Sequence, residues 1–541
     1  MNGAVAAAWI VAGLTCLCLS LYRCFCWRPL KLSRLLRSHG LTVLPYTPIV
    51  GNTLEISRLQ QAAYSCPHAS GPLDHRYLSR IWAFYFAKCT DSSTSRGASA
   101  GNSFVFWLGQ RPSLSVVNAD QAKEILSSKW KEYVKFPTAY VAVKRIFGRS
   151  LLTVDADEWE HRRRILNPAF ATDKLKAMGA QMFACVIEMI ESWEQHAQHN
   201  SMSEFELDVS REFLKVSADI LCRTSFGSNY KEGKAVFEDQ QTIIKATYRD
   251  MARHAIFPGY RFLPTARNRL CWALQRRIDK TLRRIVENRT LGVCNHEANS
   301  YGEDLLGRIL AANSSALASG SVLTTKDIID ECRTFFFAGH DTAANLLTWA
   351  AMLMAAYPDW QERARAEVLE MHGSEGHVNA HSKLKILEMI LLETLRLYTP
   401  VPQLISRTKA ADCSTGAQEA VDKQASMPPG VRLTILCGVV HRDKELWGDD
   451  ADEFHPERFA NGIARACKGM HGFMAFGFGP HICIGQTFAM LEAKLVLASV
   501  LQRFCFRLSP TYQHAPYLRA TLTPQHGMPL LITSLSQQQR V

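Results

Sequence analysis

One cysteine of this chain stands in a glycine-rich loop whose composition could support chemistry. The loop at 476–485 reads Phe-Gly-Phe-Gly-Pro-His-Ile-Cys-Ile-Gly, and a helical pattern at 486–504 follows it directly. The glycines permit a tight backbone turn. Cys483 then lies just before a helix N-terminus, where the dipole favours a thiolate. The pattern predicts a functional thiolate rather than an inert core thiol.

A thiolate in a sheltered loop with nearby peptide N–H groups is suited to haem iron. As an axial ligand it pushes electron density onto the iron and favours O–O cleavage. A Cys/His metal site built on His481 and Cys483 is the alternative. No second ligand pair at zinc spacing supports that alternative, so the haem-thiolate interpretation is favoured.

The loop resembles the haem-binding signature of cytochromes P450, Phe-x-x-Gly-x-Arg-x-Cys-x-Gly. Every fixed position matches except the arginine, which is His481 here. The resemblance implies that Cys483 is the axial ligand of haem b and that Phe476 and His481 contact the cofactor. With histidine at this position we expect a weaker or pH-sensitive propionate contact, with haem retained.

A long apolar helical pattern at 327–357 contains Ala338-Gly339-His340-Asp341-Thr342. A helical glycine weakens the helix by about 1 kcal/mol, which predicts a local widening at Gly339. The resemblance implies that Thr342 hydrogen-bonds the oxygen molecule being activated and that Asp341 helps relay protons. The alternatives are a threonine bonded to its own helix and an aspartate that is a solvated surface charge.

Two further motifs agree with the same family. Glu393 and Arg396 are spaced i, i+3 on one helix face, a common surface pairing when found alone. Followed by Arg458 in Pro-Glu-Arg-Phe, the pair resembles the buried ion-pair motif that supports the haem loop. The Trp-x-x-x-Arg pattern of Trp159 and Arg163 resembles a propionate-holding helix.

Arg407, after the turn at 400–402, is a third expected propionate partner. Arg162 and Arg164 flank Arg163 in the same helical segment. For these two we expect a basic outer face, suited to contact with the reductase.

The elements that must position these residues are mostly helical. Helical periodicity extends over 120–130, 171–196, 209–224, 267–289, 327–357, 358–371 and 383–398. A short hairpin is predicted at 104–108 and 114–117 and a strand at 432–436. We expect a mainly α chain with small β-sheets, an α+β class, and the resemblance implies the cytochrome P450 fold.

An uncharged stretch at 4–22 is long enough to cross a bilayer as a helix, and five Lys or Arg residues follow it between 23 and 37. The positive-inside rule predicts a single-pass anchor in the endoplasmic-reticulum membrane with a cytosolic catalytic domain. A cleaved secretory signal is the alternative, but it lacks a basic n-region and a small-residue cleavage site. The expected organisation is an anchor at 1–22, a basic, proline-containing linker at 23–52 and a catalytic domain at 53–541.

The composition is consistent with this organisation. A length of 541 residues with 47% hydrophobic content excludes a disordered chain. The net charge of +12 suits a membrane surface or an acidic partner, whereas no zinc-finger spacing or basic run points to nucleic acid. Sixteen scattered cysteines favour reduced thiols facing the cytosol.

The substrate is narrowed only to a class. Stretches at 257–264, 331–337 and 514–516 resemble the plant clan that holds cytokinin hydroxylases, fatty-acid hydroxylases and enzymes that inactivate gibberellins and brassinosteroids. In that family the pocket would be lined by parts of 136–146, by Phe336, Phe337 and Ala338, by Val401 and Leu404 within 401–405, and by the turn near Gly527 and Met528. These mostly apolar walls fit a small lipophilic molecule.

The interpretation favoured by these residues is a monooxygenase that uses O2 and electrons from an NADPH-dependent cytochrome P450 reductase. Two alternatives stay open at this point. A haem-thiolate isomerase or dehydratase would usually lack the Asp341 and Thr342 pair, and a non-catalytic haem-binding protein would not need it. A polar insertion at 410–427 and a polar loop at 89–103 have no assigned role.

Overall fold

The computed structural model describes the chain except residues 1, 67–72, 91–102, 137–143, 200–203, 228–229, 251–252, 254–258, 297–298, 317–321, 372–382, 411–426 and 536–541. The polar loop at 89–103 and the insertion at 410–427 therefore lie mostly outside the described residues, as does most of the expected pocket segment 136–146.

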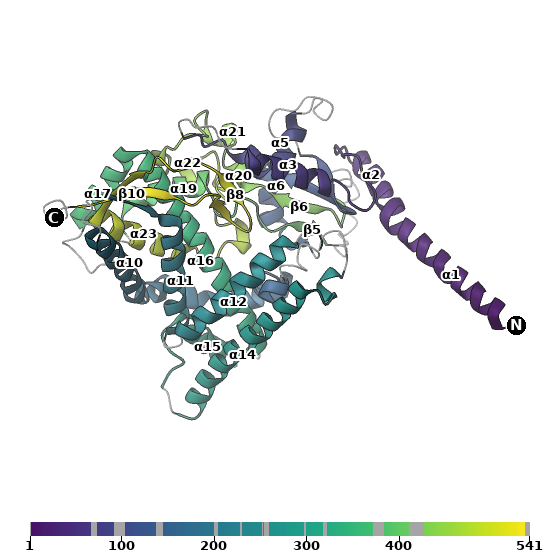
Figure 1. Cartoon of the computed structure of the whole chain (residues 1–541), viewed down its shortest axis with the longest axis horizontal. Coiled ribbons are helices and arrows are strands. Elements are labelled where there is room, and N and C mark those ends of the chain that lie inside the picture. Colours follow the sequence, from purple (N-terminus) through teal and green to yellow (C-terminus); the bar gives the residue numbers. More distant parts are fainter. Residues whose placement is uncertain are drawn as a thin grey trace.

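The N-terminus is one continuous helical rod that extends away from the rest of the molecule (Figure 1). It consists of α1 (Asn2–Tyr22), the π-helical turn η1 (Arg23–Trp27) and α2 (Arg28–Ser38). The span Ala8–Ser38 has the length and composition to cross a membrane, with a mean hydropathy of 1.7 and no burial in its most apolar window. Near its end, Leu36 is fully buried and packs against Val105 and Leu114 of the first sheet.

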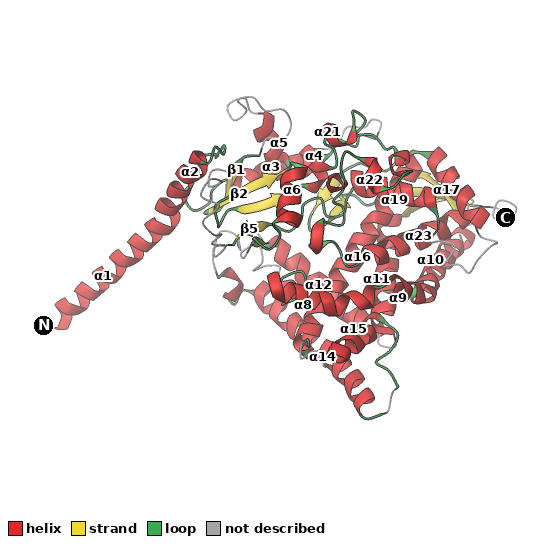
Figure 2. Cartoon of the chain, turned by 180° about the vertical axis from the view of Figure 1, so that it is seen from behind, coloured by secondary structure: helices red, strands yellow, loops and turns green. Residues whose placement is uncertain are grey.

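The body is mostly helical, as Figure 2 shows. Its helices before the long central one are α3 (Thr53–Ser65), α4 (Leu78–Ile81), α5 (Ala83–Thr90), α6 (Ala119–Lys123), η2 (Glu124–Ser128), α8 (Ala156–Leu166), η3 (Asn167–Phe170), α9 (Thr172–Ala177), α10 (Gly179–His199), α11 (Val209–Phe226), α12 (Tyr230–Arg249), η5 (Tyr260–Phe262), α14 (Ala266–Cys294) and α15 (Leu305–Ser315).

The central helix α16 (Thr325–Ala356) begins at a capping box in which Thr324 and Asp327 exchange hydrogen bonds. It ends before Pro358, whose ring disfavours a helical conformation at the preceding residue. The elements after it are α17 (Pro358–Met371), α19 (Lys385–Leu397), α20 (Cys437–Val440), α21 (Lys444–Trp447), η8 (Pro456–Phe459), α22 (Ile463–Ala466), η9 (Met470–Gly472), η10 (Gly479–His481) and α23 (Gln486–Arg503).

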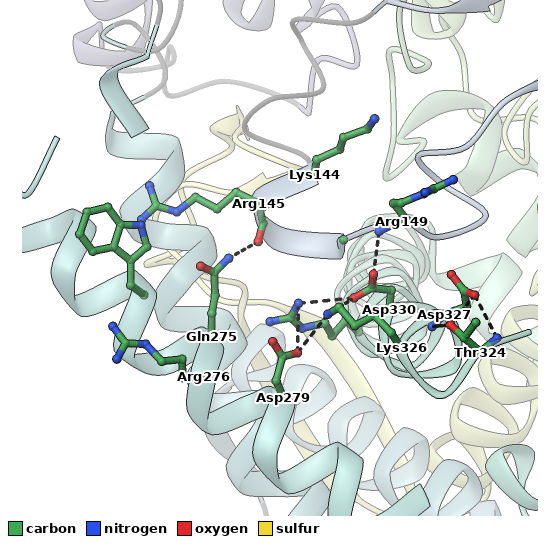
Figure 3. Close-up of a pocket in the computed structure, with 13 residues that line it drawn as sticks. Lys144, Arg145, Arg149, Gln275, Arg276, Asp279, Thr324, Lys326, Asp327 and Asp330 are labelled. Carbon is green, nitrogen blue, oxygen red and sulfur yellow. Dashed lines mark hydrogen bonds and ion pairs between the residues drawn. The ribbon is translucent and has the colours of Figure 1, made fainter. Parts of the chain in front are cut away.

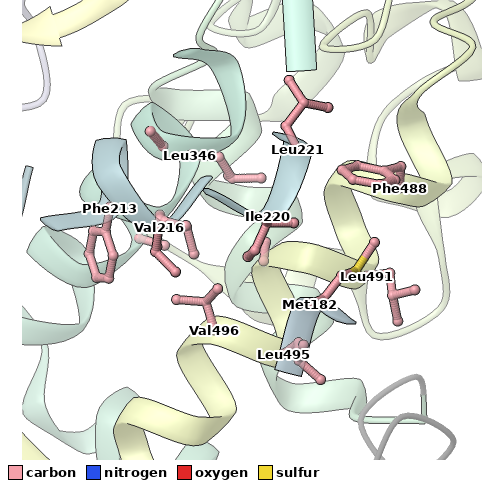
Figure 4. Packing of buried hydrophobic residues seen from close by; sticks show 14 of the residues in the cluster. Met182, Phe213, Val216, Ile220, Leu221, Leu346, Phe488, Leu491, Leu495 and Val496 are labelled. Carbon is pink, nitrogen blue, oxygen red and sulfur yellow. The ribbon is translucent and has the colours of Figure 1, made fainter. Parts of the chain in front are cut away.

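The core lies where α10, α11, α16 and α23 meet (Figure 4). Met182, Leu221, Leu346 and Val496 come from these four helices and are each 4% exposed or less. Burying such side chains stabilises the fold by roughly 1.5–3 kcal/mol each. The core thereby holds the middle of α16 against the helix that follows Cys483.

The strands form small sheets beside this core. One sheet has the order β1-β2-β6-β5-β3, another β4-β10-β7, and β8 pairs with β9. Their bounds are β1 (Val105–Leu108), β2 (Arg111–Val116), β3 (Tyr133–Lys135), β4 (Glu204–Asp208), β5 (Arg407–Lys409), β6 (Arg432–Ile435), β7 (Phe504–Leu508), β8 (Pro516–Leu518), β9 (Leu522–Pro524) and β10 (Pro529–Ser534).

The predicted α+β class, the hairpin and the long helices are confirmed. The helical run at 171–196 is divided into α9 and α10, and the run at 120–130 becomes α6 and a π-helical turn. No sequence pattern predicted α12, α15 or any strand outside the hairpin and β6. The hairpin pairs antiparallel, with Val105 opposite Leu114, and β2 pairs parallel with β6.

Candidate active site

The loop before α23 holds Cys483 by backbone hydrogen bonds. The Cys483 N–H donates to the Phe476 carbonyl at 2.8 Å, and the Ile482 N–H donates to the Gly479 carbonyl at 3.1 Å. Gly479 has φ +71°, and a Cβ there would lie 2.4 Å from the Leu126 carbonyl oxygen. The turn therefore requires glycine at this position.

The Cys483 side chain has exposed surface although it lies deep in the molecule. Burial raises the pKa of its thiol, while the Gly485 N–H and the charge of Arg163 act in the lowering direction. The helix dipole alone thus does not produce the expected thiolate. An exposed thiol at a desolvated position faces an interior space, and a bound metal cation would reverse the pKa shift.

His481 lies between two tryptophans. Its ring centroid is 3.9 Å from that of Trp159 and 5.2 Å from that of Trp130. Burial, followed by the charges of Arg407, Lys135 and Arg163, lowers the pKa of His481 to about 2. Its imidazole is therefore neutral at physiological pH.

Arg163 and Arg407, the two arginines expected to hold propionates, both lie near this histidine. The Arg163 Nη1 donates to the Ile482 carbonyl at 2.9 Å, next to Cys483. Arg407 is buried on β5, where its backbone is paired with Lys135 of β3. This lysine was missed, because only the pairing of β3 with β5 brings residue 135 to the site.

Burial, and then the charge of Arg407, lowers the pKa of Lys135 to about 7. The Lys135 ammonium donates to the Leu151 and Val154 carbonyls and lies 4.0 Å from Asp155. The pKa is lowered mainly because burial disfavours the charged form, and the neighbouring Arg407 adds a second buried cation to this site. A dianionic group such as a pair of propionates fits this surplus of positive charge.

The helix α16 is continuous through 338–342, so the expected widening at Gly339 is absent. A Cβ on Gly339 would lie 3.0 Å from Leu221 of α11, so the glycine serves close helix packing. The Thr342 hydroxyl donates to the Ala338 carbonyl at 2.6 Å. The Asp341 carboxylate accepts a hydrogen bond from the Thr521 hydroxyl, in the turn between β8 and β9.

The middle of α16 has an exposed face although its flanks are buried. Ala338 is exposed, and Phe337, Asp341 and Thr342 are half-buried. Of the other expected pocket residues, Val401 and Leu404 are also half-buried. The turns of α16 on either side of this face lie in the core.

Phe336 and Met528 were expected in the pocket lining, but their side chains are buried in the core. Phe336 is 2% exposed and stacks on Phe226 at a centroid distance of 4.5 Å. Met528 is 0% exposed, and its N–H donates to Asp208 at 2.8 Å. Both side chains pack the core because the neighbouring elements α11 and β4 cover them. The hairpin of β8 and β9, which no sequence pattern predicted, reaches α16 through the Thr521 hydroxyl and the Leu522 carbonyl.

Glu393 and Arg396 form a fully buried bidentate pair, with both N–O distances at 2.7 Å. Arg396 also donates to the carbonyls of His441, Ala451 and Glu453. Arg458 lies 3.5 Å from Glu393. The three residues thus occupy one buried cluster, as the motif predicted.

His441 connects this cluster to the cysteine loop. Its Nδ1 bonds the Arg396 carbonyl at 3.1 Å, and its Nε2 accepts the Met474 N–H at 2.9 Å. Met474 in turn accepts the Gly477 N–H at 2.9 Å. Burial lowers the pKa of His441 to about 3, so the ring acts as a neutral donor and acceptor. Sequence reasoning missed it, because a lone histidine carries no spacing signal.

Arg162 does not lie on a basic outer face, whereas Arg164 is exposed as expected. Arg162 is 3% exposed and pairs with Glu331 at 3.1 Å and with Asp327 at 2.5 Å. The expectation for Arg162 was wrong because these two acids of α16 lie against α8. Within the described ranges no group of three His, Cys, Asp or Glu residues could hold a metal ion.

Comparison with known proteins gives one consistent family. Residues 91–530 match the family model described as Cytochrome P450. The chain is 37% identical over 525 residues to Cytochrome P450 734A6 of Oryza sativa subsp. japonica, covering 95% of this chain and 93% of the relative. It is 36% identical to Cytochrome P450 CYP72A616 of Paris polyphylla over 98% of both chains. It is also 35% identical to Cytochrome P450 709B1 of Arabidopsis thaliana over 94% of both.

Proposed function

The chain belongs to the cytochrome P450 family, and from this premise we propose which of its residues serve the reaction and what they act on. It is a haem-thiolate monooxygenase that uses O2 and reductase-supplied electrons. When bound, haem b with a thiolate ligand activates molecular oxygen for insertion into the substrate.

Cys483 is the proposed axial ligand. The backbone N–H of Cys483 donates to the Phe476 carbonyl and fixes the residue in the loop. The assignment is supported by the exposed surface of the Cys483 thiol at a desolvated position. This observation carries the assignment, since a core thiol without such a role would be packed by neighbours. The propionates and the edge of the haem would be held by five residues near this loop: Trp159, Arg163, Arg407, His481 and Lys135.

Asp341 and Thr342 are proposed to handle protons on the opposite side. The Thr342 hydroxyl can rotate away from the Ala338 carbonyl while its oxygen accepts a hydrogen bond from water. The Thr521 hydroxyl holds one Asp341 oxygen, which orients this carboxyl. The pair is thereby suited to hold and move a proton at the threonine oxygen.

The proposed substrate is a small lipophilic molecule, within the classes of cytokinins, gibberellins, brassinosteroids and fatty acids. Its support is the half-buried apolar surface of Phe337, Val401 and Leu404 around exposed Ala338. Apolar walls of this kind favour isoprenoid, steroid or acyl groups over charged ones.

The apolar helix at Ala8–Ser38 is a candidate membrane anchor. We place the protein in the endoplasmic-reticulum membrane, with 53–541 as a cytosolic catalytic domain and the NADPH-dependent reductase as its partner. The basic residues after the apolar stretch support this orientation.

The test is a product screen in reductase-containing microsomes. Wild-type protein should give a reduced, carbon-monoxide-bound spectrum typical of thiolate haem and should hydroxylate one of the four classes with NADPH and O2. Conversion of a substrate without NADPH would instead indicate an isomerase or dehydratase. The absence of product from all four classes would refute the substrate proposal while leaving the spectrum intact.

A further inference from the structure

A cavity of about 830 Å3 lies between α14, the first turns of α16 and the segment 144–149 (Figure 3). Its lining contains none of the residues proposed to hold the haem, and none of Phe337, Ala338, Val401 and Leu404. We call it the basic pocket, since its charged lining residues are the cations Lys144, Arg145, Arg149, Arg276, Lys326 and Arg333 and the acids Asp279, Asp327 and Asp330.

The basic pocket holds three more cations than carboxylates, and its acids are already engaged. Lys326 lies 2.9 Å from Asp330 and 3.4 Å from Asp279. Arg333 lies 3.5 Å from Asp279 and 3.6 Å from Asp330. The carboxylates therefore neutralise the floor of the pocket and offer little to an incoming cation.

The third acid and one cation pair with residues outside the lining. Asp327 pairs with Arg162 at 2.5 Å, and Arg149 pairs with Glu158 at 2.8 Å. Arg162 adds one positive charge and Glu158 adds one negative charge, so the surplus of three cations in the lining is unchanged. Lys144 and Arg276 are exposed, and neither makes an ion pair within the described part of the chain. An incoming anion thus meets uncompensated positive charge at the rim.

The walls of the pocket are tied together before any ligand binds. Gly148 has φ +64°, and a Cβ there would lie 2.2 Å from the Asp330 carboxylate, so the backbone approaches α16 closely. The Arg149 N–H donates to Asp330 at 2.9 Å. Gln275 of α14 donates to the Arg145 carbonyl, and the Arg145 guanidinium donates to Asn268 at 2.6 Å. Such preorganisation lowers the entropic cost of binding.

We propose that the basic pocket binds a small phosphate-bearing anion. Several cations spread around one cavity match a group with many acceptor oxygens, and arginine side chains recognise phosphate by paired hydrogen bonds. The volume lies within the range of small-molecule sites, roughly 300–1,000 Å3. The phosphate can belong to a soluble molecule or to a lipid headgroup.

The test uses full-length, haem-loaded protein in neutral detergent, titrated calorimetrically with pyrophosphate. Saturable binding of one pyrophosphate per chain is expected. The double variant Lys144→Gln with Arg276→Gln should bind at least about tenfold more weakly, because each side chain removed can supply one charge-assisted hydrogen bond. The matched control, Arg269→Gln with Lys280→Gln, removes two exposed charges from α14 outside the lining and should keep wild-type affinity.

Other results would overturn the proposal. These are no saturable binding by wild type, an equal loss in the control variant, or citrate binding as tightly as pyrophosphate. Each variant is first shown to retain its carbon-monoxide spectrum, so a folding defect is not mistaken for lost binding. Nanodiscs distinguish the two phosphate sources: competition by phosphatidic acid assigns the site to a headgroup, and no competition assigns it to a soluble phosphate.

Discussion

The loop that carries Cys483 and the middle of α16 are proposed to face the same haem, but they are held in different ways. The loop is held from outside, through the Arg396, His441 and Met474 hydrogen bonds. The α16 segment is held mainly by its own helix, with Thr342 bonded to Ala338. We call these the cysteine side and the helix side. The first cannot shift without breaking buried bonds, whereas the second keeps polar groups that can change partners.

We expect the largest effect when the proposed haem ligand on the cysteine side, Cys483, is removed. Cys483→Ala should abolish the carbon-monoxide spectrum, because alanine supplies no electron-rich sulfur. Cys437→Ala is the matched control, since Cys437 is buried and its thiol donates to the Val401 carbonyl at 3.2 Å. A thiolate-type spectrum from Cys483→Ala would contradict the assignment.

Glu393→Ala should destabilise the cysteine side by about 3–5 kcal/mol, because Arg396 is left as a buried, uncompensated charge. Low haem occupancy after expression and a lower Tm are the readouts. Glu287→Ala on α14 removes an ion pair with Arg283 in which both side chains are 50% exposed. That variant should change Tm little, and equal behaviour of the two would return Glu393 to the status of a surface residue.

His441→Phe should cost about 1–3 kcal/mol, since the Met474 N–H loses its acceptor in a buried position. The ring volume is roughly kept, so packing against Phe473 is preserved. We expect partial haem loss and a shift of the carbon-monoxide band away from the thiolate position. An unchanged band and Tm would show that His441 does not position the cysteine loop.

Glu492 of α23 gives a pH-dependent prediction on the cysteine side. It is fully buried, and burial raises its pKa to about 8 from 4.5. The folded state therefore holds a proton that the unfolded state releases above about pH 4.5. Stability falls as pH rises through this window, by at most about 1.4 kcal/mol per unit.

Glu492→Gln removes this dependence. The Tm of the variant relative to wild type should rise between pH 5 and 8 and level off above pH 8. Glu370→Gln, an exposed residue of α17, is the control and should give a constant difference. A constant difference for Glu492→Gln as well would contradict the raised pKa.

The smallest effect on stability is expected on the helix side. Thr342→Ala should keep haem content and Tm, but less product should form per NADPH and more hydrogen peroxide should be released. Thr348→Ala is the matched control, because the Thr348 hydroxyl donates to the Ala344 carbonyl at 2.7 Å in a fully packed part of α16. An unchanged product yield in Thr342→Ala would support the alternative of a threonine bonded only to its own helix.

The sequence predicted best those features that depend on neighbouring residues. Helical periodicity located α16 and α23, and the Glu393–Arg396 pair follows from i, i+3 spacing. The family resemblance, not any local pattern, joined that pair to Arg458.

Long-range contacts were beyond local patterns. The pairing of β4 with β10 joins segments more than 300 residues apart. Lys135 enters the site through strand pairing, and Arg162 is buried because α16 supplies two acids. Burial of Phe336 depends on the position of α11. Such contacts are set by tertiary packing, which hydrophobic period alone does not specify.

The partners of Arg396 also impose an order on folding during synthesis. Apart from Glu393, they are carbonyls that lie 45, 55 and 57 residues later in the chain. A nascent chain that ends after α19 therefore exposes a guanidinium whose buried partners have not yet been made. Domains fold as units once their contacts are available, so α19 should reach its native, protected state only after the chain has passed residue 453. We expect ribosome-bound chains shorter than this to remain protease-sensitive around α19 even when haem is supplied.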